Sequence, residues 1–389
     1  MEVKSLSDVK KANKGLLYEC IREYKQVSIT DLVHITKLSR PTVTELVRKM
    51  ETEGTVAKVS RGASNGGRAP MLYGINSKAA FAMGIDLEFP TLRMAISDLE
   101  GEMICSSIRR YPPDSDKDMV LSLLLKQIED MVSESKIDTE KLLGVGIGVP
   151  GVIDRKNNLS VIIERIQGWE NVPIAAILEQ RFGWPVYIYN DVDMLAWAER
   201  KFSDLKDADM LYIALLYGIG MSIWMDGKVI QGEGGNAGRI GHMLVNTEGP
   251  ECKCGSRGCL GLYTGERAMC RIYRELSGKS VSGAKELLSL ADQGDAAAVE
   301  TLETTGHYLG IGIVNVANLF DISHIVVSAP FDVTRFIELA KPALAARERN
   351  TLRRKITVVP GKMGEEQYAL GGCMMVLEKV SSEALGNLS

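Results

Sequence analysis

A cluster of potential metal ligands near the middle of the chain constrains how its central loop can fold. One histidine precedes three cysteines with the spacing Cys-x-Cys-x4-Cys, and the four residues are His242, Cys252, Cys254 and Cys259. An imidazole and three thiolates complete the tetrahedral shell of a zinc ion and leave no open position, so the pattern predicts a structural metal and not a catalytic one. Gly255 and Gly258 permit the tight backbone that lets the thiolates converge.

The other cysteines and the apolar runs indicate where the protein works. The chain has seven cysteines, an odd number, and the clustering of three within eight residues favours metal binding over unrelated core thiols. The remaining four lie in apolar contexts typical of a core: Cys20, Cys105, Cys270 and Cys373. Neither a signal peptide nor a membrane-spanning apolar run is recognisable, so we expect a cytoplasmic protein with no membrane partner.

Charge is distributed unevenly along the 389 residues, whose formal net charge is −4. Residues 1–76 hold 13 basic and 8 acidic residues, a net charge of +5, so the remainder carries −9. The length suggests two or three domains, and the small basic part suggests a nucleic-acid partner. Chance asymmetry is the alternative, since a difference of this size also arises without a functional cause.

Three helical patterns fill most of residues 1–54. The first and third have apolar stripes at helical spacing, formed by Leu17, Cys20, Ile21 and Tyr24 and by Val43, Leu46, Val47 and Met50. Ser28 and Asp31 form a start signal for a short second helix that ends near Ile35, and Ser39 with Pro41 starts the third. This arrangement predicts a helix-turn-helix whose third helix enters the major groove of DNA.

Two predicted strands, 55–59 and 71–75, follow these helices and flank a glycine-rich basic tip suited to the DNA backbone or minor groove. The predicted domain is therefore a winged helix-turn-helix. Its candidate contacts to bases and phosphates are Ser39, Arg40, Thr42, Thr44, Arg48, Lys49, Arg61 and Arg68. Further candidate phosphate contacts are Lys10, Lys11 and Lys14. A small helical module for protein interaction is the alternative that the pattern leaves open.

From residue 82 onward strands and helices alternate and glycines are frequent, which is typical of an α/β fold. Two similar openings of strand, glycine turn and strand, near Ile85 and Leu211, suggest two related halves. The most specific motifs are Ile147-Gly-Val-Pro-Gly151, Asn190-Asp191, Ala237-Gly-x-Ile-Gly-His242 and Cys252-x-Cys-Gly-x-x-Gly-Cys259. Their order resembles the ROK family of repressors and sugar kinases, which share a two-lobed, actin-like ATPase fold, and the layout is similar to the family's transcriptional branch.

The resemblance implies a division into three parts. These are a winged helix-turn-helix at residues 1–76, an N-terminal α/β lobe at 80–200 and a C-terminal α/β lobe at 201–371. The last segment, 372–389, is expected to form a helix that packs on the N-terminal lobe. The C-terminal lobe is expected to hold the structural zinc and the interface of a homodimer or homotetramer.

The nucleotide-binding motifs of the family are altered in this chain. ROK kinases carry Asp-x-Gly-Gly-Thr in the first phosphate loop, whereas the equivalent run here, 86–90, reads Asp-Leu-Glu-Phe-Pro. The second loop, Gly-Thr-Gly-x-Gly in kinases, reads Leu-Tyr-Gly-Ile-Gly at 216–220, and the glycines of the adenine side are replaced by Ser328-Ala-Pro330. Glycines let backbone N–H groups approach the phosphates, so we expect kinase activity to be lost.

The sugar-binding motifs are partly kept. The resemblance implies that Asn190, Asp191 and His242 contact a sugar, although the first two can also cap a helix. Two glutamates of the family are missing, because Arg239 stands in place of one and Gly261 in place of the other. Arginine suits bidentate binding of carboxylates and phosphates, so we hypothesise that Arg239 selects an acidic sugar derivative. The alternative is that Arg239 turns outward to an acidic neighbour.

These patterns predict a DNA-binding transcriptional regulator of carbohydrate genes, most simply a repressor, which binds an operator as a homodimer and responds to a sugar between its lobes. An ATP-dependent sugar kinase with an appended DNA-binding head is one alternative. A ligand-free scaffold that represses through protein partners is another. The effector, the operator, the sign of regulation and the choice between dimer and tetramer are left open by the sequence.

Overall fold

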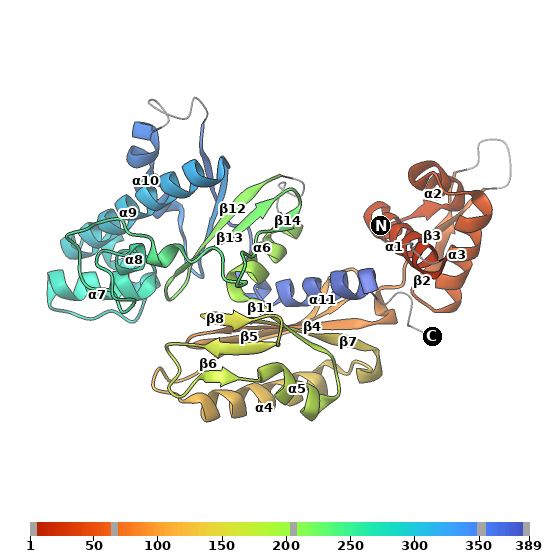
Figure 1. The fold of residues 1–389 in the computed structure, drawn as a ribbon, viewed down its shortest axis with the longest axis horizontal. Helices are drawn as coiled ribbons and strands as arrows, with labels where there is room; N and C mark the ends of the chain where they lie inside the picture. The colour runs from red at the N-terminus through yellow and green to blue at the C-terminus, as the bar shows by residue number, and fades with distance from the viewer. Residues whose placement is uncertain (1–5, 64–68, 203–207, 348–354, 384–389) are drawn as a thin grey trace.

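The computed structural model describes residues 6–63, 69–202, 208–347 and 355–383, which form a small N-terminal head and two α/β lobes (Figure 1). The elements of the head are α1 (Leu6–Tyr24), β1 (Val27–Ser28), α2 (Ile29–Thr36), α3 (Arg40–Thr52), β2 (Val56–Arg61) and β3 (Met71–Ile75), with strand order β1-β3-β2. The Ser28 hydroxyl accepts from the Asp31 N–H and the Asp31 carboxylate accepts from the Ser28 N–H, which starts α2. The predicted winged helix-turn-helix is confirmed.

Two details of the head differ from the sequence-based expectation. Tyr24, assigned to the buried stripe, is 51% exposed, because it is the last residue of α1 and extends beyond the core. Lys14, a candidate phosphate contact, is 3% exposed, and its Nζ lies 2.5 Å from the Glu53 carboxylate. Its charge is therefore directed into the head and away from any DNA. Arg68 lies outside the described residues, and the side chain of Lys11 is not described either.

The first lobe is built on a five-stranded sheet with the order β11-β7-β4-β5-β6. Its elements are η1 (Ser77–Ala79), β4 (Phe81–Glu88), β5 (Thr91–Asp98), β6 (Met103–Arg110), α4 (Lys117–Ser135), η2 (Thr139–Lys141), β7 (Leu142–Val149), β8 (Val152–Asp154), β9 (Leu159–Ile162), β10 (Glu170–Val172), α5 (Ile174–Phe182), β11 (Val186–Asn190) and α6 (Asp191–Phe202). Met83 and Ile85 share a core with residues of α4 and α5, whereas Ala82 on the opposite face packs on α11.

The second lobe repeats this topology with the strand order β14-β13-β12-β15-β16. Its elements are β12 (Met210–Leu215), β13 (Ile219–Met225), β14 (Lys228–Val229), η3 (Ile240–His242), η4 (Leu260–Leu262), α7 (Glu266–Ser277), α8 (Ala284–Asp292), α9 (Ala296–Phe320), β15 (His324–Ser328), α10 (Thr334–Arg347), β16 (Thr357–Pro360) and η6 (Glu365–Gln367). In both sheets the first two connections are antiparallel and the last two pairings are parallel. The expectation of two related halves is therefore confirmed.

One helix, α11 (Leu370–Glu383), packs on the first lobe and also reaches the head (Figure 1). It lies on β4 and β7 so closely that a Cβ on Gly84 would approach the Ala369 carbonyl oxygen to 1.8 Å. It also contacts α6 and, in the head, α1. The head is held to the first lobe by a second contact, the ion pair between Lys25 and Glu100 at 3.5 Å.

None of the helices in the described ranges combines the length and the apolar character that crossing a bilayer requires.

Candidate functional site

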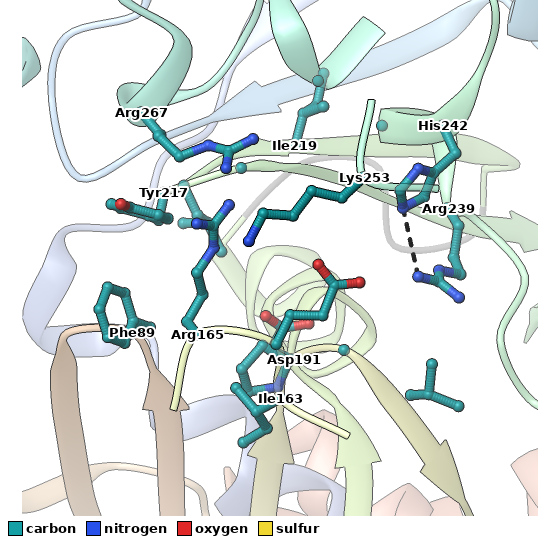
Figure 2. A pocket seen from close by; sticks show the side chains of 18 of the residues that line it. Phe89, Ile163, Arg165, Asp191, Tyr217, Ile219, Arg239, His242, Lys253 and Arg267 are labelled. Carbon is teal, nitrogen blue, oxygen red and sulfur yellow. Dashed lines mark hydrogen bonds between the residues drawn. The ribbon is translucent and has the colours of Figure 1, made fainter. Parts of the chain in front are cut away.

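A cavity of about 230 Å³ lies between the two lobes (Figure 2). The first lobe contributes the β4–β5 turn, residues 150–152 and 162–165, and the start of α6. The second lobe contributes the segment between β12 and β13, the loop that carries the predicted metal ligands, and Arg267 at the start of α7. The cavity thus has a metal-loop end and a β4–β5 end.

The four predicted metal ligands come together at the metal-loop end. The donor atoms of His242, Cys252, Cys254 and Cys259 all lie within 4.8 Å of one another. Cys252 Sγ is 3.8 Å from His242 Nδ1, and Cys254 Sγ is 3.6 Å from Cys259 Sγ. Tetrahedral ligands at zinc-like bond lengths stand about 3.3–3.8 Å apart, so this donor set fits a four-coordinate metal ion. Gly258 has φ +65°, and a Cβ there would lie 1.5 Å from the Asn246 carbonyl oxygen.

The two ring nitrogens of His242 face different groups, the cysteine thiolates and Arg239. Its Nδ1 faces the thiolates, and its Nε2 lies 3.4 Å from Nη2 of Arg239 (Figure 2). Arg239 lines the cavity, and within the described part of the chain it forms no ion pair. Gly261, at the second position where the family has a glutamate, also lines the cavity, close to Gly241.

The predicted Asn-Asp pair is divided between two roles. Asp191 lines the cavity at the first residue of α6 and is 7% exposed. Burial, together with the charge of nearby Asp86, raises the pKa of Asp191 to about 8. The Asn190 side chain instead accepts from the Val192 N–H at 3.1 Å, as a helix cap does, and is not among the lining residues. The structure therefore brings Asp191, Arg239 and His242 to one cavity and places the Asn190 amide beside it.

At the β4–β5 end, a carboxylate binds the segment that corresponds to the second phosphate loop. The Glu88 Oε1 atom accepts from the backbone N–H of Tyr217 at 3.2 Å. The ring of Phe89 packs edge-on against Tyr217 at a centroid distance of 5.2 Å, and both Glu88 and Phe89 are 6% exposed. The two loops that would surround a nucleotide's phosphates are therefore bound to each other.

Arg93 binds Glu88 and so stabilises its contact with Tyr217. Its guanidinium, 2% exposed, donates to Asp86 at 2.9 Å, to Glu88 at 2.7 Å and to Glu365 of the second lobe at 2.8 Å. Burial acts to lower the pKa of Arg93, but the charges of Asp86 and Glu88 raise it above its ordinary value. Burial also raises the pKa of Asp86 to about 7. This cluster was not predicted from the sequence, where its signal is an arginine inside the apolar strand 92–96.

Three further cations line the cavity and were also missed: Arg165, Lys253 and Arg267. No motif identifies them, because each stands alone in its own loop or helix start. Lys253 lies between two predicted metal ligands, and that position was the one available signal.

The predicted DNA contacts lie on the head, away from the cavity. Arg40, Arg48 and Lys49 are exposed on α3, and Arg61 is exposed at the end of β2. Ser39 caps α3 by accepting from the Thr42 N–H at 3.3 Å, and its hydroxyl is 2.8 Å from that of Thr42. The Thr44 hydroxyl donates to the Arg40 carbonyl oxygen. Within the described residues the three arginines form no ion pair, Lys49 lies 3.9 Å from the Glu53 carboxylate, and the three hydroxyls have partners at the start of α3.

The paired α/β lobes with an N-terminal head define a class of protein, and comparison with known proteins identifies its family. The model of the ROK family matches residues 82–379, and the chain belongs to this family. Over 381 residues the chain is 26% identical to the xylose repressor of Bacillus subtilis (strain 168), covering 97% of this chain and 98% of that protein.

Two solved structures differ in whether they match the head as well as the two lobes. The crystal structure of a ROK family transcriptional regulator, a homologue of the E. coli MLC protein, matches with a TM-score of 0.79 at 23% identity and covers 98% of both chains. A ROK family glucokinase from Streptomyces griseus, in complex with glucose and AMPPNP, matches with a TM-score of 0.64 at 25% identity. It covers 76% of this chain but 99% of the kinase, so about a quarter of this chain has no counterpart there.

Proposed function

We propose that this protein is a sugar-responsive transcriptional repressor that binds operator DNA through its head. The observation that carries the proposal is the joining of a winged helix-turn-helix to ROK lobes, a layout matched along nearly the whole length of a xylose repressor. We place the domain limits at 1–76, 80–200 and 201–371, with 372–389 assigned to the N-terminal lobe. The protein is proposed to act in the cytoplasm as a homodimer or homotetramer.

The DNA-contacting face is proposed to be the exposed side of α3 together with the wing. Arg40, Arg48, Lys49 and Arg61 are its cations, and Thr44 adds a methyl and a hydroxyl on the same helix. Ser39 and Thr42 are proposed to order the start of α3 through their cap hydrogen bonds, which holds neighbouring Arg40 in place beside the DNA.

Loss of kinase activity is part of the proposal. The Tyr217 N–H, which in a kinase would be free for a phosphate oxygen, is bound by Glu88, and the ring of Phe89 packs against Tyr217 beside it. A coupled ATPase assay with a series of hexoses tests this directly. Turnover above background with any hexose would favour the alternative, a kinase with a DNA-binding head.

The cavity is proposed to bind the effector, with Asp191, Arg239 and His242 as contacts and Asn190 as the cap beside them. The cysteines and His242 Nδ1 are proposed to hold a structural zinc ion, which leaves a hydrogen on Nε2. Because Arg239 Nη2 is also a donor, two donors 3.4 Å apart then face the same space. An acceptor with negative charge suits them better than a neutral hydroxyl, which supports an acidic sugar derivative.

Ligand binding is proposed to act on DNA through α11. This helix packs on the first lobe and also contacts α1 of the head, so a change in lobe closure would alter the spacing of the two heads in a dimer.

Selection of bound sequences from random DNA, followed by fluorescence anisotropy at several salt concentrations, tests the proposal. We expect a steep salt dependence, at least tenfold weaker binding by Arg48→Ala, and release by one member of a sugar panel. Arg274→Ala, at an exposed arginine on α7 of the second lobe, serves as the matched control. Failure to enrich any DNA sequence, or equal binding by both variants, would contradict the role of the head.

A further inference from the structure

Three cationic side chains converge within the cavity from three separate segments. Arg165 follows β9 in the first lobe, Lys253 lies in the metal loop, and Arg267 is the second residue of α7. Figure 2 shows their charged heads directed toward one another, beside the ring of Tyr217. The group therefore spans both lobes and is fixed to the loop that carries the proposed zinc ligands.

Arg165 and Arg267 are half-buried and Lys253 is exposed, and all three lack the counter-charges that buried Arg93 has. Within the described ranges none of them forms a salt bridge, and the one contact found for Arg165 is with the face of the Tyr217 ring, at 4.9 Å. Arg93, in contrast, is bound by three carboxylates. Burial and the positive charge of Arg267 lower the pKa of Arg165, which is the sign of two like charges in proximity.

The acidic groups of the cavity do not balance this charge. Glu88 is bound to Arg93, and Asp191, with a pKa of about 8, is largely protonated at neutral pH. Glu164 is the remaining carboxylate among the lining residues, and it is exposed. With Arg239 added, four cations face this space against one ionised, unpaired carboxylate.

We infer that Arg165, Lys253 and Arg267 bind the phosphate group of a phosphorylated sugar, whose sugar part extends toward Arg239 and His242. A phosphate monoester offers three oxygens and nearly two negative charges, so three cations that approach from different directions can each reach one. A carboxylate has two oxygens in one plane and a single charge. The inference rests on the proposed function, since it assigns a chemical class to the effector of the same cavity.

The position of the three cations also explains how this phosphate would affect the lobes. Arg165 moves with the first lobe, whereas Lys253 and Arg267 move with the second. In the absence of an anion these charges repel each other across the cavity, and a bound phosphate reverses the sign of that interaction. The effector thus has the differential affinity for a closed arrangement that a conformational signal requires.

Isothermal titration calorimetry with inorganic phosphate, at an ionic strength held constant with chloride, tests the subsite. The variants are Arg165→Gln and Arg267→Gln, and Arg274→Gln, exposed on the same helix as Arg267, is the matched control. We expect each of the first two to weaken phosphate binding about tenfold or more, the loss expected for one charge-assisted hydrogen bond, and the control to bind as the wild type does. Arg267→Lys should retain part of the affinity.

Hexose 6-phosphates, their parent hexoses and ATP extend the titration. A hexose phosphate that binds more tightly than both inorganic phosphate and its parent supports the inference. Absence of phosphate binding, equal binding by all variants, or arginine-dependent binding of ATP above that of every monophosphate overturns it. If a parent sugar binds and releases DNA while phosphates do neither, the inference fails and the proposed function stands. If no sugar or sugar phosphate alters DNA binding, the sugar-responsive function itself fails.

Discussion

The two ends of the interlobe cavity differ in what holds their loops in place. At the metal-loop end, four potential metal ligands from one lobe converge on a single point. At the β4–β5 end, Glu88 and Arg93 reach across to the backbone and a carboxylate of the other lobe. One end is therefore organised within a lobe, and the other is organised between lobes.

This difference shows how a kinase fold can serve a different purpose. The donor set at the metal-loop end consists of one histidine and three cysteines and involves no nucleotide, so it can be kept independently of phosphoryl transfer. Around the phosphates, a kinase needs open backbone N–H groups, and here a carboxylate binds one of them. Glu88 places a carboxylate against the Tyr217 N–H and so joins the two lobes.

Removing the metal should lower the stability of the protein more than any change at the β4–β5 end of the cavity. In Cys259→Ser the fully buried ligand can no longer bind zinc as a thiolate, and the loop from 243 to 259 loses its anchor. We expect a loss of roughly 5 kcal/mol or more in the free energy of unfolding, below the 10–16 kcal/mol of isolated zinc fingers because the lobe has its own core. Metal content by mass spectrometry and chemical unfolding measure this.

Cys270→Ser is the matched control, since Cys270 is half-buried on α7 and outside the metal cluster. It should keep its full metal content. The effector response of Cys259→Ser should fall more than its DNA binding. Equal metal content in both variants, or an unchanged effector response after metal loss, would contradict the role given to this end.

Arg93→Met should have the second largest effect. The substitution keeps an apolar stem but leaves three carboxylates, Asp86, Glu88 and Glu365, without their shared cation. Breaking a buried pair from one side costs about 3–5 kcal/mol, and the loss should shrink at low pH, where these carboxylates take up protons. Urea unfolding at two pH values measures it, with exposed Arg109→Met as the control. A loss below about 0.5 kcal/mol would show that Arg93 does not hold this end.

The part of the fold that sequence reasoning predicted well is the part specified locally. The cap residues Ser28, Asp31 and Ser39 lie within three residues of the N–H groups they bind, and the apolar stripe of α3 is a property of one helix. The predicted metal ligands are similar, because three of the four lie within eight residues of one loop. These signals can be recognised from neighbouring residues alone, without knowing where distant segments of the chain lie.

The groups that sequence reasoning missed are those assembled by tertiary contact. Arg93 and Glu365 are separated by 272 positions and meet because α11 and the segment before it return to the first lobe. Arg165 and Lys253 belong to different lobes, and nothing near either residue indicates the other. Asp191 was recognised from its motif, but its raised pKa depends on burial and on Asp86, which one sequence does not place beside it.

Asp191→Asn should change how stability depends on pH. Burial raises the pKa of Asp191 from 3.8 to about 8, so between these values the folded protein binds a proton that the unfolded chain does not. Stability from this group is complete below about pH 4 and falls as the pH rises toward 8, by up to about 1.4 kcal/mol per pH unit. The variant should lose this slope in urea unfolding from pH 5 to 8. Parallel curves for the two proteins would refute the assignment.

Lys285→Gln should have the smallest effect on stability. It allows the exposed and the buried cation that share the Glu365 carboxylate to be compared. Glu365 is shared by buried Arg93 and by Lys285, whose side chain is 64% exposed and whose Nζ lies 3.6 Å from the carboxylate. Water and salt screen the exposed pair, so we expect a change of about 0–1 kcal/mol that vanishes at high ionic strength. Urea unfolding at low and high salt measures it beside Arg93→Met. If the two variants lost equal stability, the contact between the lobes would depend on the whole charge network and not on the single buried arginine.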